Sequence, residues 1–381
     1  MAVVIIGGGQ GGFQTAASLR AEGYQERITL IGDEPGVPYQ RPPLSKGFLL
    51  GKQEQRHAEL RPAAFYETQR ITLVTARATA IDRVARRVTL DSGECIEYDT
   101  LVLATGARNR LLPHEGALYL RTLPEATEIR ERLRNANEVA IIGGGFIGLE
   151  VAAAARTLGK HVTVIESQAR LMARVVAPAV SDFFREQHAA RGVEIILNAP
   201  AGAELRQDLV IAGIGVVPNV ELAQAAGLPV GNGVTVDEHL RTPDQRIYAI
   251  GDCAECPSTF AEGRVRLESV QNAVDQAASV AKAIAGHAAP YRAVPWFWTD
   301  QYDVHMQMAG LPVGYDQLVT RGNPETRKFS VFYFRGGKLC AADSINRPAD
   351  HLAARKLIGA RTMLSPDQAR DESFDLKTAT N

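Results

Sequence analysis

The chain has 381 residues, a formal net charge of −1 at pH 7 and 45% hydrophobic residues, a length at which two or three domains are expected. The near-zero charge gives no basis for a nucleic-acid or membrane-surface partner, and no apolar run approaches the roughly 20 residues of a membrane-spanning helix. Four cysteines in a chain of this length do not form a disulfide framework. We therefore expect a soluble cytoplasmic protein with no nucleic-acid or membrane partner, and we expect a monomer.

The first predicted element is a buried β-strand over residues 3–6, followed directly by a glycine-rich turn. Gly7, Gly9 and Gly12 match the pattern G-x-G-x-x-G. In this pattern the first glycine permits a tight turn, the second lets the backbone approach a pyrophosphate, and the third lets the following helix pack closely. Residues 13–20 are the predicted helix, whose N-terminus would face the negative charge.

A second strand over residues 27–31 is followed by Asp33. An acidic side chain at this distance from the glycines can accept hydrogen bonds from a ribose hydroxyl. The strand, turn, helix and acid together predict a dinucleotide site. The proline-rich loop that follows, residues 35–46, places Arg41 and Lys46 close behind that site, although the loop alone is equally consistent with an ordinary stiffened connection.

Further strands are predicted at residues 71–79, 87–90 and 98–107, the last ending in Thr105 and Gly106. A strand that ends in small residues can pass close beneath a bound dinucleotide.

Residues 139–166 repeat the opening unit. After a strand at 139–142, Gly143, Gly145 and Gly148 again match G-x-G-x-x-G, and a helix, a strand and Glu166 follow. We expect each unit to hold its own dinucleotide. Glu166 suits a free 2′-hydroxyl and would repel a 2′-phosphate, which favours NADH over NADPH, while the nearby Arg170 argues the other way.

Two more buried strands are predicted, over residues 208–218 and 246–252, with Asp252 just past the end of the second. Ligands of open α/β sheets bind at the carboxyl ends of strands, so Asp252 is placed to hold part of a cofactor; it could also be a turn or cap residue.

A helix is predicted at 272–285. From about residue 293 an aromatic segment and four strands, at 304–309, 317–321, 329–334 and 338–342, predict a separate α+β domain, and the polar stretch after Pro366 is expected to be loose.

Taken together, these motifs resemble the FAD-dependent NADH:ferredoxin reductases of oxygenase systems. The motifs that carry the resemblance are the two glycine patterns, residues 41–46 (R-P-P-L-S-K), 104–107 (A-T-G-A), Gly251-Asp252 and 296–301 (W-F-W-T-D-Q). The resemblance covers nearly the whole chain. It implies an α/β fold with two Rossmann-like dinucleotide-binding domains, as in glutathione reductase, and a C-terminal α+β domain. The implied domains are FAD-binding (1–110 and 238–292), NADH-binding (111–237) and C-terminal (293–381).

The resemblance also implies the site residues. For FAD they are Gly7, Gly9, Gly11, Gly12, Asp33, Arg41, Lys46, Ala78, Ala104, Thr105, Gly106, Arg121, Gly251, Asp252, Val270 and Trp298; for NADH they are Gly143, Gly145, Gly148, Glu150 and Glu166. Lys46, Glu150 and Trp298 are the implied catalytic residues, with Glu150 paired to Lys46 and Trp298 on the ferredoxin-facing side. Glu150 could instead be a solvated carboxylate on a helix face. Between Ile195 and Asp208 the chain is shorter than the family pattern, as if a β-hairpin were absent.

The implied activity is electron transfer from NADH through FAD to a [2Fe–2S] ferredoxin that serves a cytochrome P450 or a Rieske oxygenase. No cysteine precedes Cys95, which argues against reduction of a disulfide beside the flavin. Cys253 and Cys256 form a solitary C-x-x-C that could be redox-active or part of a metal site, but no second pair accompanies it, and we expect no metal. Two alternatives stay open: reduction of rubredoxin, a quinone or a small oxidant, and an NADH-responsive sensor similar to apoptosis-inducing factor.

Overall fold

The structure, a computed structural model, describes residues 1–113, 116–200 and 207–380. The chain forms two compact units. Unit 1 comprises residues 1–40, 58–108 and 217–293, and unit 2 comprises residues 41–57, 109–216 and 294–381. Each unit contains a five-stranded parallel sheet, and unit 2 adds a five-stranded antiparallel sheet. The predicted fold class is therefore confirmed.

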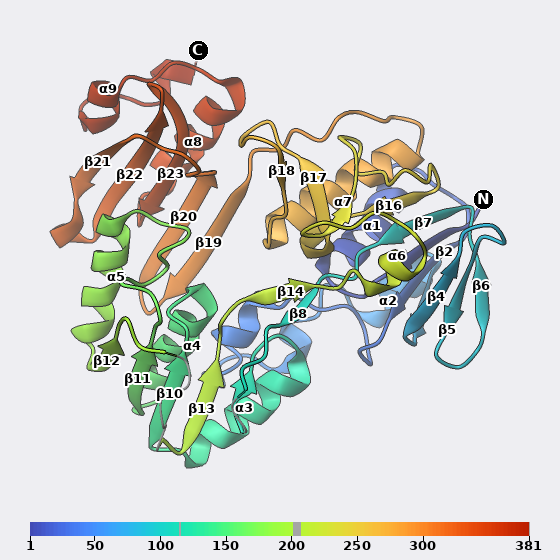
Figure 1. The fold of residues 1–381 in the computed structure, drawn as a ribbon, viewed down its shortest axis with the longest axis horizontal. Coiled ribbons are helices and arrows are strands. Elements are labelled where there is room, and N and C mark those ends of the chain that lie inside the picture. The colour runs from blue at the N-terminus through green and yellow to red at the C-terminus, as the bar shows by residue number, and fades with distance from the viewer. Residues whose placement is uncertain (114–115, 201–206, 381) are drawn as a thin grey trace. The chain divides into compact units, whose positions relative to one another are not determined.

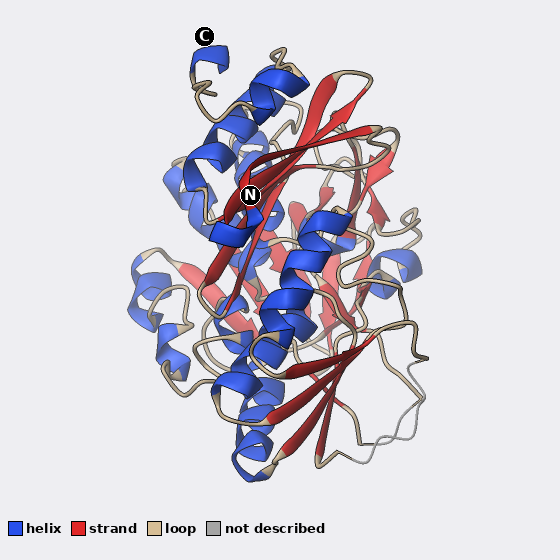
Figure 2. Cartoon of the chain, turned by 90° about the vertical axis from the view of Figure 1, so that its left-hand side faces the viewer, coloured by secondary structure: helices blue, strands red, loops and turns tan. Residues whose placement is uncertain are grey.

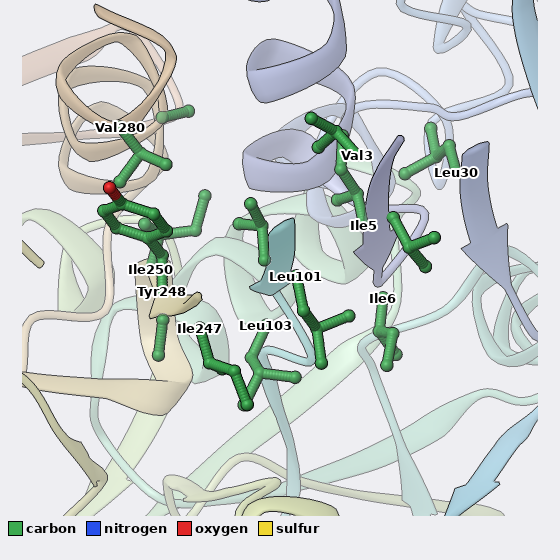
Figure 3. Packing of buried hydrophobic residues seen from close by; sticks show 14 of the residues in the cluster. Val3, Ile5, Ile6, Leu30, Leu101, Leu103, Ile247, Tyr248, Ile250 and Val280 are labelled. Atoms are coloured by element: carbon green, nitrogen blue, oxygen red, sulfur yellow. The ribbon is translucent and has the colours of Figure 1, made fainter. Parts of the chain in front are cut away.

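The parallel sheet of unit 1 has the strand order β16-β7-β1-β2-β3. Its strands are β1 (Val3–Ile6), β2 (Ile28–Gly32), β3 (Ile71–Thr75), β7 (Thr100–Leu103) and β16 (Ile247–Ala249). Buried aliphatic side chains from β1, β2, β7 and β16 form the core, with Val280 from a helix beside Tyr248 and Ile250 (Figure 3). Strands covered on both faces need such continuous apolar runs, which is why residues 3–6 are wholly apolar.

Helices α1 (Gln10–Ala21) and α7 (Val270–Ile284) pack against each other on this core. The α7 helix begins where the hydroxyl of Ser269 accepts a hydrogen bond from the backbone N–H of Asn272, an N-cap. The smaller elements of unit 1 are α2 (Ala63–Thr68), α6 (Glu221–Ala225), the antiparallel strands β4 (Ala78–Asp82), β5 (Arg87–Leu90) and β6 (Cys95–Glu97), and the strands β15 (Val234–Thr235), β17 (Ala254–Pro257) and β18 (Arg264–Val265).

The parallel sheet of unit 2 has the order β12-β11-β10-β13-β9. Its strands are β9 (Leu118–Tyr119), β10 (Glu138–Ile142), β11 (His161–Ile165), β12 (Val193–Ile196) and β13 (Leu209–Ala212), and its helices are α3 (Leu123–Asn135), α4 (Phe146–Thr157) and α5 (Pro178–Ala189). A capping box between Thr122 and Glu125 starts α3.

The antiparallel sheet of unit 2 has the order β19-β20-β23-β22-β21. It comprises β19 (Trp296–Gln301), β20 (Val304–Gly310), β21 (Gln317–Asn323), β22 (Lys328–Arg335) and β23 (Lys338–Ile345), followed by α8 (Pro348–Ala360) and α9 (Pro366–Arg370) (Figure 1). Figure 2 colours the helices and strands of the chain separately and marks both termini. This sheet shares one core with the parallel sheet: the rings of Phe183 on α5 and Phe329 on β22 lie 5.1 Å apart. Figure 1 shows α4 next to both β10 and β19.

Several predicted boundaries were wrong. The predicted strand 71–79 is two strands, β3 and β4, and the predicted strand 98–107 ends at Leu103, because the chain then turns at Gly106 with a φ of 65°. Residues 208–218 contain β13 and a short β14 (Val216–Pro218), and β8 spans Ala107–Asn109. The stretch after Pro366 is not loose, because the buried guanidinium of Arg321 donates hydrogen bonds to backbone carbonyls of Ala369, Asp371, Glu372 and Phe374.

The division into three domains stays a prediction. The unusually short segment predicted between residues 195 and 208 includes residues 201–206, which lie outside the described residues. Among the residues that the structure describes, no helix combines the length and apolar character needed to cross a membrane.

Candidate functional site

The first glycine turn connects β1 to α1 in unit 1, and packing within the protein requires two of its glycines. A Cβ atom on Gly7, whose φ is 124°, would lie 2.0 Å from the carbonyl oxygen of Ala104, and one on Gly12 would lie 1.9 Å from the carbonyl oxygen of Gly7. A Cβ on Gly9 would meet no atom within 4 Å. Gly9 thus borders open space at the N-terminus of α1, where no side chain caps the helix. This cradle fits the pyrophosphate of a dinucleotide.

The second glycine turn, between β10 and α4 in unit 2, has the same design. A Cβ on Gly143 would lie 2.4 Å from the carbonyl oxygen of Gly213, and one on Gly148 would lie 2.1 Å from that of Gly143. Gly145 has open space around it and is the uncapped N-cap of α4. Both turns therefore fit a pyrophosphate, each within its own unit.

The two predicted ribose-binding acids follow the second strand of each repeat. Asp33 is exposed just after β2. Glu166 follows β11, and its carboxylate accepts hydrogen bonds from the backbone N–H groups of Gly144 (2.7 Å) and Gln168 (2.8 Å). The carboxylate is thereby fixed beside the second glycine turn.

Arg170 is committed elsewhere in unit 2. Its guanidinium donates hydrogen bonds to the carbonyl oxygens of Val176 (2.7 Å) and Ala173 (2.6 Å) and to the hydroxyl of Ser181 (2.8 Å). These bonds hold the cation in the segment that precedes α5, so the structure removes the reason to expect a 2′-phosphate partner for it.

The other residues predicted for FAD in unit 1 lie on several segments, of which some contact the first turn or α7. Ala104 contacts Gly7 as described, and Gly11 and Gly251 both lie against Ala273 of α7. Thr105 and Gly106 lie between β7 and β8, and Asp252 lies in the 3-10 turn Gly251–Cys253. Val270 is the first residue of α7, and Ala78 is the first residue of β4.

Lys46 and Glu150 form an ion pair in unit 2. The Lys46 Nζ lies 2.7 Å from Glu150 Oε2. Lys46 comes from the turn after the short 3-10 helix η1 (Pro42–Ser45), and Glu150 comes from the first turns of α4, directly after the second glycine turn. Glu150 is only 3% exposed, so it is not a solvated carboxylate on a helix face. The pairing of Glu150 with Lys46 that the family resemblance implied is therefore present.

Two hydroxyl groups that the sequence prediction missed complete the surroundings of this carboxylate. Ser45 Oγ donates to Glu150 Oε2 at 2.5 Å, and Thr299 Oγ1 donates to Glu150 Oε1 at 2.6 Å. Both donors are buried. Burying an ionised carboxylate is costly unless it is paired and hydrogen-bonded, and here all three donors contribute. Ser45 directly precedes Lys46 in the motif R-P-P-L-S-K of residues 41–46. This position in the motif is the one sequence signal that could have identified Ser45.

Arg41, Arg121 and Trp298 also belong to unit 2. Arg41 donates to the backbone carbonyl of Arg121 at 2.6 Å, which ties the proline-rich loop to the start of α3. Trp298 on β19 is half-buried, and its ring lies 5.7 Å from that of Trp296. Trp296 in turn packs 5.5 Å from the ring of His351.

The C-x-x-C pair has the surroundings of structural cysteines. Cys253 and Cys256 are free, buried thiols, and burial raises the pKa of both. A reactive thiol instead needs an exposed, electropositive setting that lowers its pKa. Across residues 1–113, 116–200 and 207–380, no three His, Cys, Asp or Glu side chains group in a way that could hold a metal ion.

Comparison with known proteins gives matches over the whole chain. The family described as pyridine nucleotide-disulphide oxidoreductase matches residues 1–277, and the reductase C-terminal family matches residues 296–380. Rhodocoxin reductase of Rhodococcus erythropolis is 49% identical, over 100% of this chain and 94% of the relative.

Two solved structures are closely similar. One is the ferredoxin reductase for the CYP199A2 system from Rhodopseudomonas palustris, with a TM-score of 0.96 and 46% identity, covering 100% of both chains. The other is the covalent putidaredoxin reductase–putidaredoxin complex, with a TM-score of 0.95 and 41% identity, covering 99% of this chain and 97% of the other.

Proposed function

Because the chain belongs to the pyridine nucleotide-disulphide oxidoreductase family, we propose that it transfers electrons from NADH through FAD to a [2Fe–2S] ferredoxin that supplies an oxygenase. FAD and NAD(H) are its cofactors. The bound flavin supplies the chemistry, which is to accept a hydride and release the two electrons one at a time. The named relatives support the acceptor, because one was solved as a covalent complex with putidaredoxin and another serves a P450 system.

The observation that carries this proposal is the ion pair between Lys46 and the buried Glu150, which follows the second glycine turn. In our assignment the turn would hold NADH, Glu150 would orient the nicotinamide, and Lys46 would supply a positive charge that favours added electrons on the flavin. The ion pair with Glu150 fixes the position of Lys46. The first turn holds the ADP half of FAD, with Asp33 accepting hydrogen bonds from its ribose.

The cysteines support electron transfer over disulfide reduction. Cys95 is exposed on β6, and Cys253, Cys256 and Cys340 are buried, free thiols. None of them lies in the first βα unit or directly after it, where a redox pair beside the flavin would be needed, because no cysteine precedes Cys95. We also place the enzyme in the cytoplasm, because free thiols are typical of that compartment.

We propose NADH as the physiological donor. Glu166 is held next to the second glycine turn by Gly144 and Gln168, and a carboxylate there accepts from a 2′-hydroxyl but repels a 2′-phosphate. We assign FAD binding to residues 1–110 and 238–292, NADH binding to 111–237, and a C-terminal domain to 293–381.

The deciding experiment is cytochrome c reduction by the FAD-loaded protein with NADH, with and without each member of a panel of [2Fe–2S] ferredoxins, and a rubredoxin as a control acceptor. We expect reduction to depend strongly on a ferredoxin and to be much slower with NADPH. Rapid bleaching of the flavin by NADH that no ferredoxin can reverse would overturn the proposal and favour a sensor. A preference for rubredoxin would change the proposed acceptor from a ferredoxin to rubredoxin and leave the rest of the proposal intact.

A further inference from the structure

The Glu150 carboxylate is one end of a chain of hydrogen bonds that continues through unit 2. Thr299 Oγ1 lies 2.6 Å from Glu150 Oε1, and Gln301 Nε2 lies 3.3 Å from Thr299 Oγ1. His188 Nε2 lies 2.9 Å from Gln301 Oε1, and the Tyr302 hydroxyl lies 3.2 Å from His188 Nδ1. Four hydrogen bonds thus connect a half-buried tyrosine to a buried carboxylate.

The interior of this chain is shielded from water. Thr299 and Gln301 on β19 are each 1% exposed, and His188 near the end of α5 is 0% exposed. Burial lowers the pKa of His188 to about 4, so its imidazole is neutral at pH 7 and carries a single N–H. Hydrogen bonds in such surroundings polarise one another.

The charge on Glu150 sets the direction of every bond in the chain. An ionised carboxylate can only accept, so the single proton of the Thr299 hydroxyl points to it. Thr299 must then accept from the amide NH₂ of Gln301, which leaves the Gln301 carbonyl oxygen facing the imidazole. His188 therefore carries its proton on Nε2, and Nδ1 accepts from the Tyr302 hydroxyl. All four donors point toward the carboxylate.

We propose that Thr299, Gln301 and His188 are positioning residues that keep the Glu150 carboxylate turned toward Lys46 for the reduction of the flavin by NADH. This inference rests on the proposed function, because it assigns a role in that reaction to residues that act through Glu150. The aligned dipoles stabilise the buried carboxylate at Oε1, whereas Lys46 contacts Oε2. The chain does not deliver protons, because Gln301 interrupts it with an amide, which does not readily take up and release a proton.

The first test is the tautomer of His188, measured by ¹⁵N NMR on FAD-loaded, ¹⁵N-histidine-labelled protein and assigned with His188→Asn. The wild type should show a neutral ring protonated at Nε2. In Glu150→Gln, Lys46 and Ser45 both donate toward the same atom, so the new amide places its oxygen there and its NH₂ toward Thr299. The Thr299 hydroxyl can then keep its own proton bonded along the chain only by donating to Gln301. We therefore expect each later bond to reverse and the proton of His188 to move to Nδ1.

A matched pair of variants at Thr299 tests the role in the reaction. Thr299→Val keeps the side-chain shape without the hydroxyl, whereas Thr299→Ser keeps the hydroxyl. We expect flavin reduction by NADH in stopped flow to slow by about tenfold in T299V, the size of one hydrogen bond to a charged group, and to stay within about twofold of wild type in T299S. In the T299V background, E150Q should no longer change the tautomer of His188, because the hydroxyl that connects residue 150 to Gln301 is absent.

A wild-type ring protonated at Nδ1, a tautomer unaffected by E150Q, or equal reduction rates in T299V and T299S would each overturn the inference. Failure of the proposed function looks different. In that case wild-type flavin would not be reduced by NADH, or no ferredoxin would accept its electrons, while the tautomer measurement would still report on the chain.

Discussion

Replacing Lys46 by methionine is expected to destabilise unit 2, because the Glu150 carboxylate would stay buried without its cation. The Glu150 side chain is 2% exposed and that of Lys46 is 22% exposed. Removing one partner of a fully buried pair costs about 3–5 kcal/mol. Lys46 reaches solvent, and the hydroxyls of Ser45 and Thr299 still donate to the carboxylate, so we expect about 2–3 kcal/mol.

The assay is urea unfolding of four proteins in excess FAD: wild type, K46M, E150Q and K46M/E150Q. The double variant has no buried carboxylate without a cation, because Glu150 is replaced as well. It should therefore be more stable than K46M by about 1–2 kcal/mol. K46M should also slow flavin reduction by NADH, because the charge that favours added electrons is lost. Additive effects of the two substitutions, or a K46M protein with wild-type stability and reduction rate, would refute the reasoning.

Three further predictions concern the glycine turns, the donor preference and acid stability. Gly9→Ala should fold, because its Cβ meets no protein atom, and should lose FAD affinity, because the backbone there can no longer approach a pyrophosphate closely. Gly12→Ala should fail to form the turn, because its Cβ would lie 1.9 Å from the Gly7 carbonyl oxygen. Equal FAD binding by G9A and wild type, measured by fluorescence titration, would contradict this. Glu166→Ala should narrow the ratio of kcat/KM for NADH over NADPH by about tenfold or more, and an unchanged ratio would remove Glu166 from the site. Because the pKa of His188 is lowered to about 4 in the fold, the unfolded chain binds its proton first, so stability present above pH 6.5 should be lost as the pH falls toward 4, by up to about 3 kcal/mol. Burial raises the pKa of Asp343 to about 7, which acts in the opposite sense, so the urea midpoints of wild type and H188Q are compared at each pH, and parallel curves would contradict the assignment.

The parts of the site that the sequence predicts are those set by local sterics. Gly7 and Gly12 are required by carbonyl oxygens within the same turn or the adjoining strand end, so their spacing alone identifies the cradle. Lys46 and Glu150 are 104 residues apart, and only the resemblance to a family suggested that they pair. Thr299 was beyond reach, because neighbouring residues of a strand point to opposite faces and the sequence does not show which face of β19 meets α4.

Helix α5 (Pro178–Ala189) was not among the predicted elements. In α5, Val180, Phe183 and Phe184 follow the spacing of a helix with one apolar face, so the signal was present and was passed over. The polar stretch after Pro366 was misjudged because its anchor, Arg321, lies on a distant strand and binds backbone carbonyls, whose capacity to accept hydrogen bonds is independent of side-chain type.

The path of the chain limits how such reductases can be recombined. The backbone passes from one unit to the other after residues 40, 57, 108, 216 and 293, and the loop that carries Lys46 belongs to the same unit as Glu150. A chimera that exchanges residues 1–110 with a relative would therefore import a foreign Lys46 loop while keeping the native α4 that it must fit. Crossover points placed after residues 40 and 57 would keep the loop with its partner helix, and functional hybrids should be found preferentially among such designs.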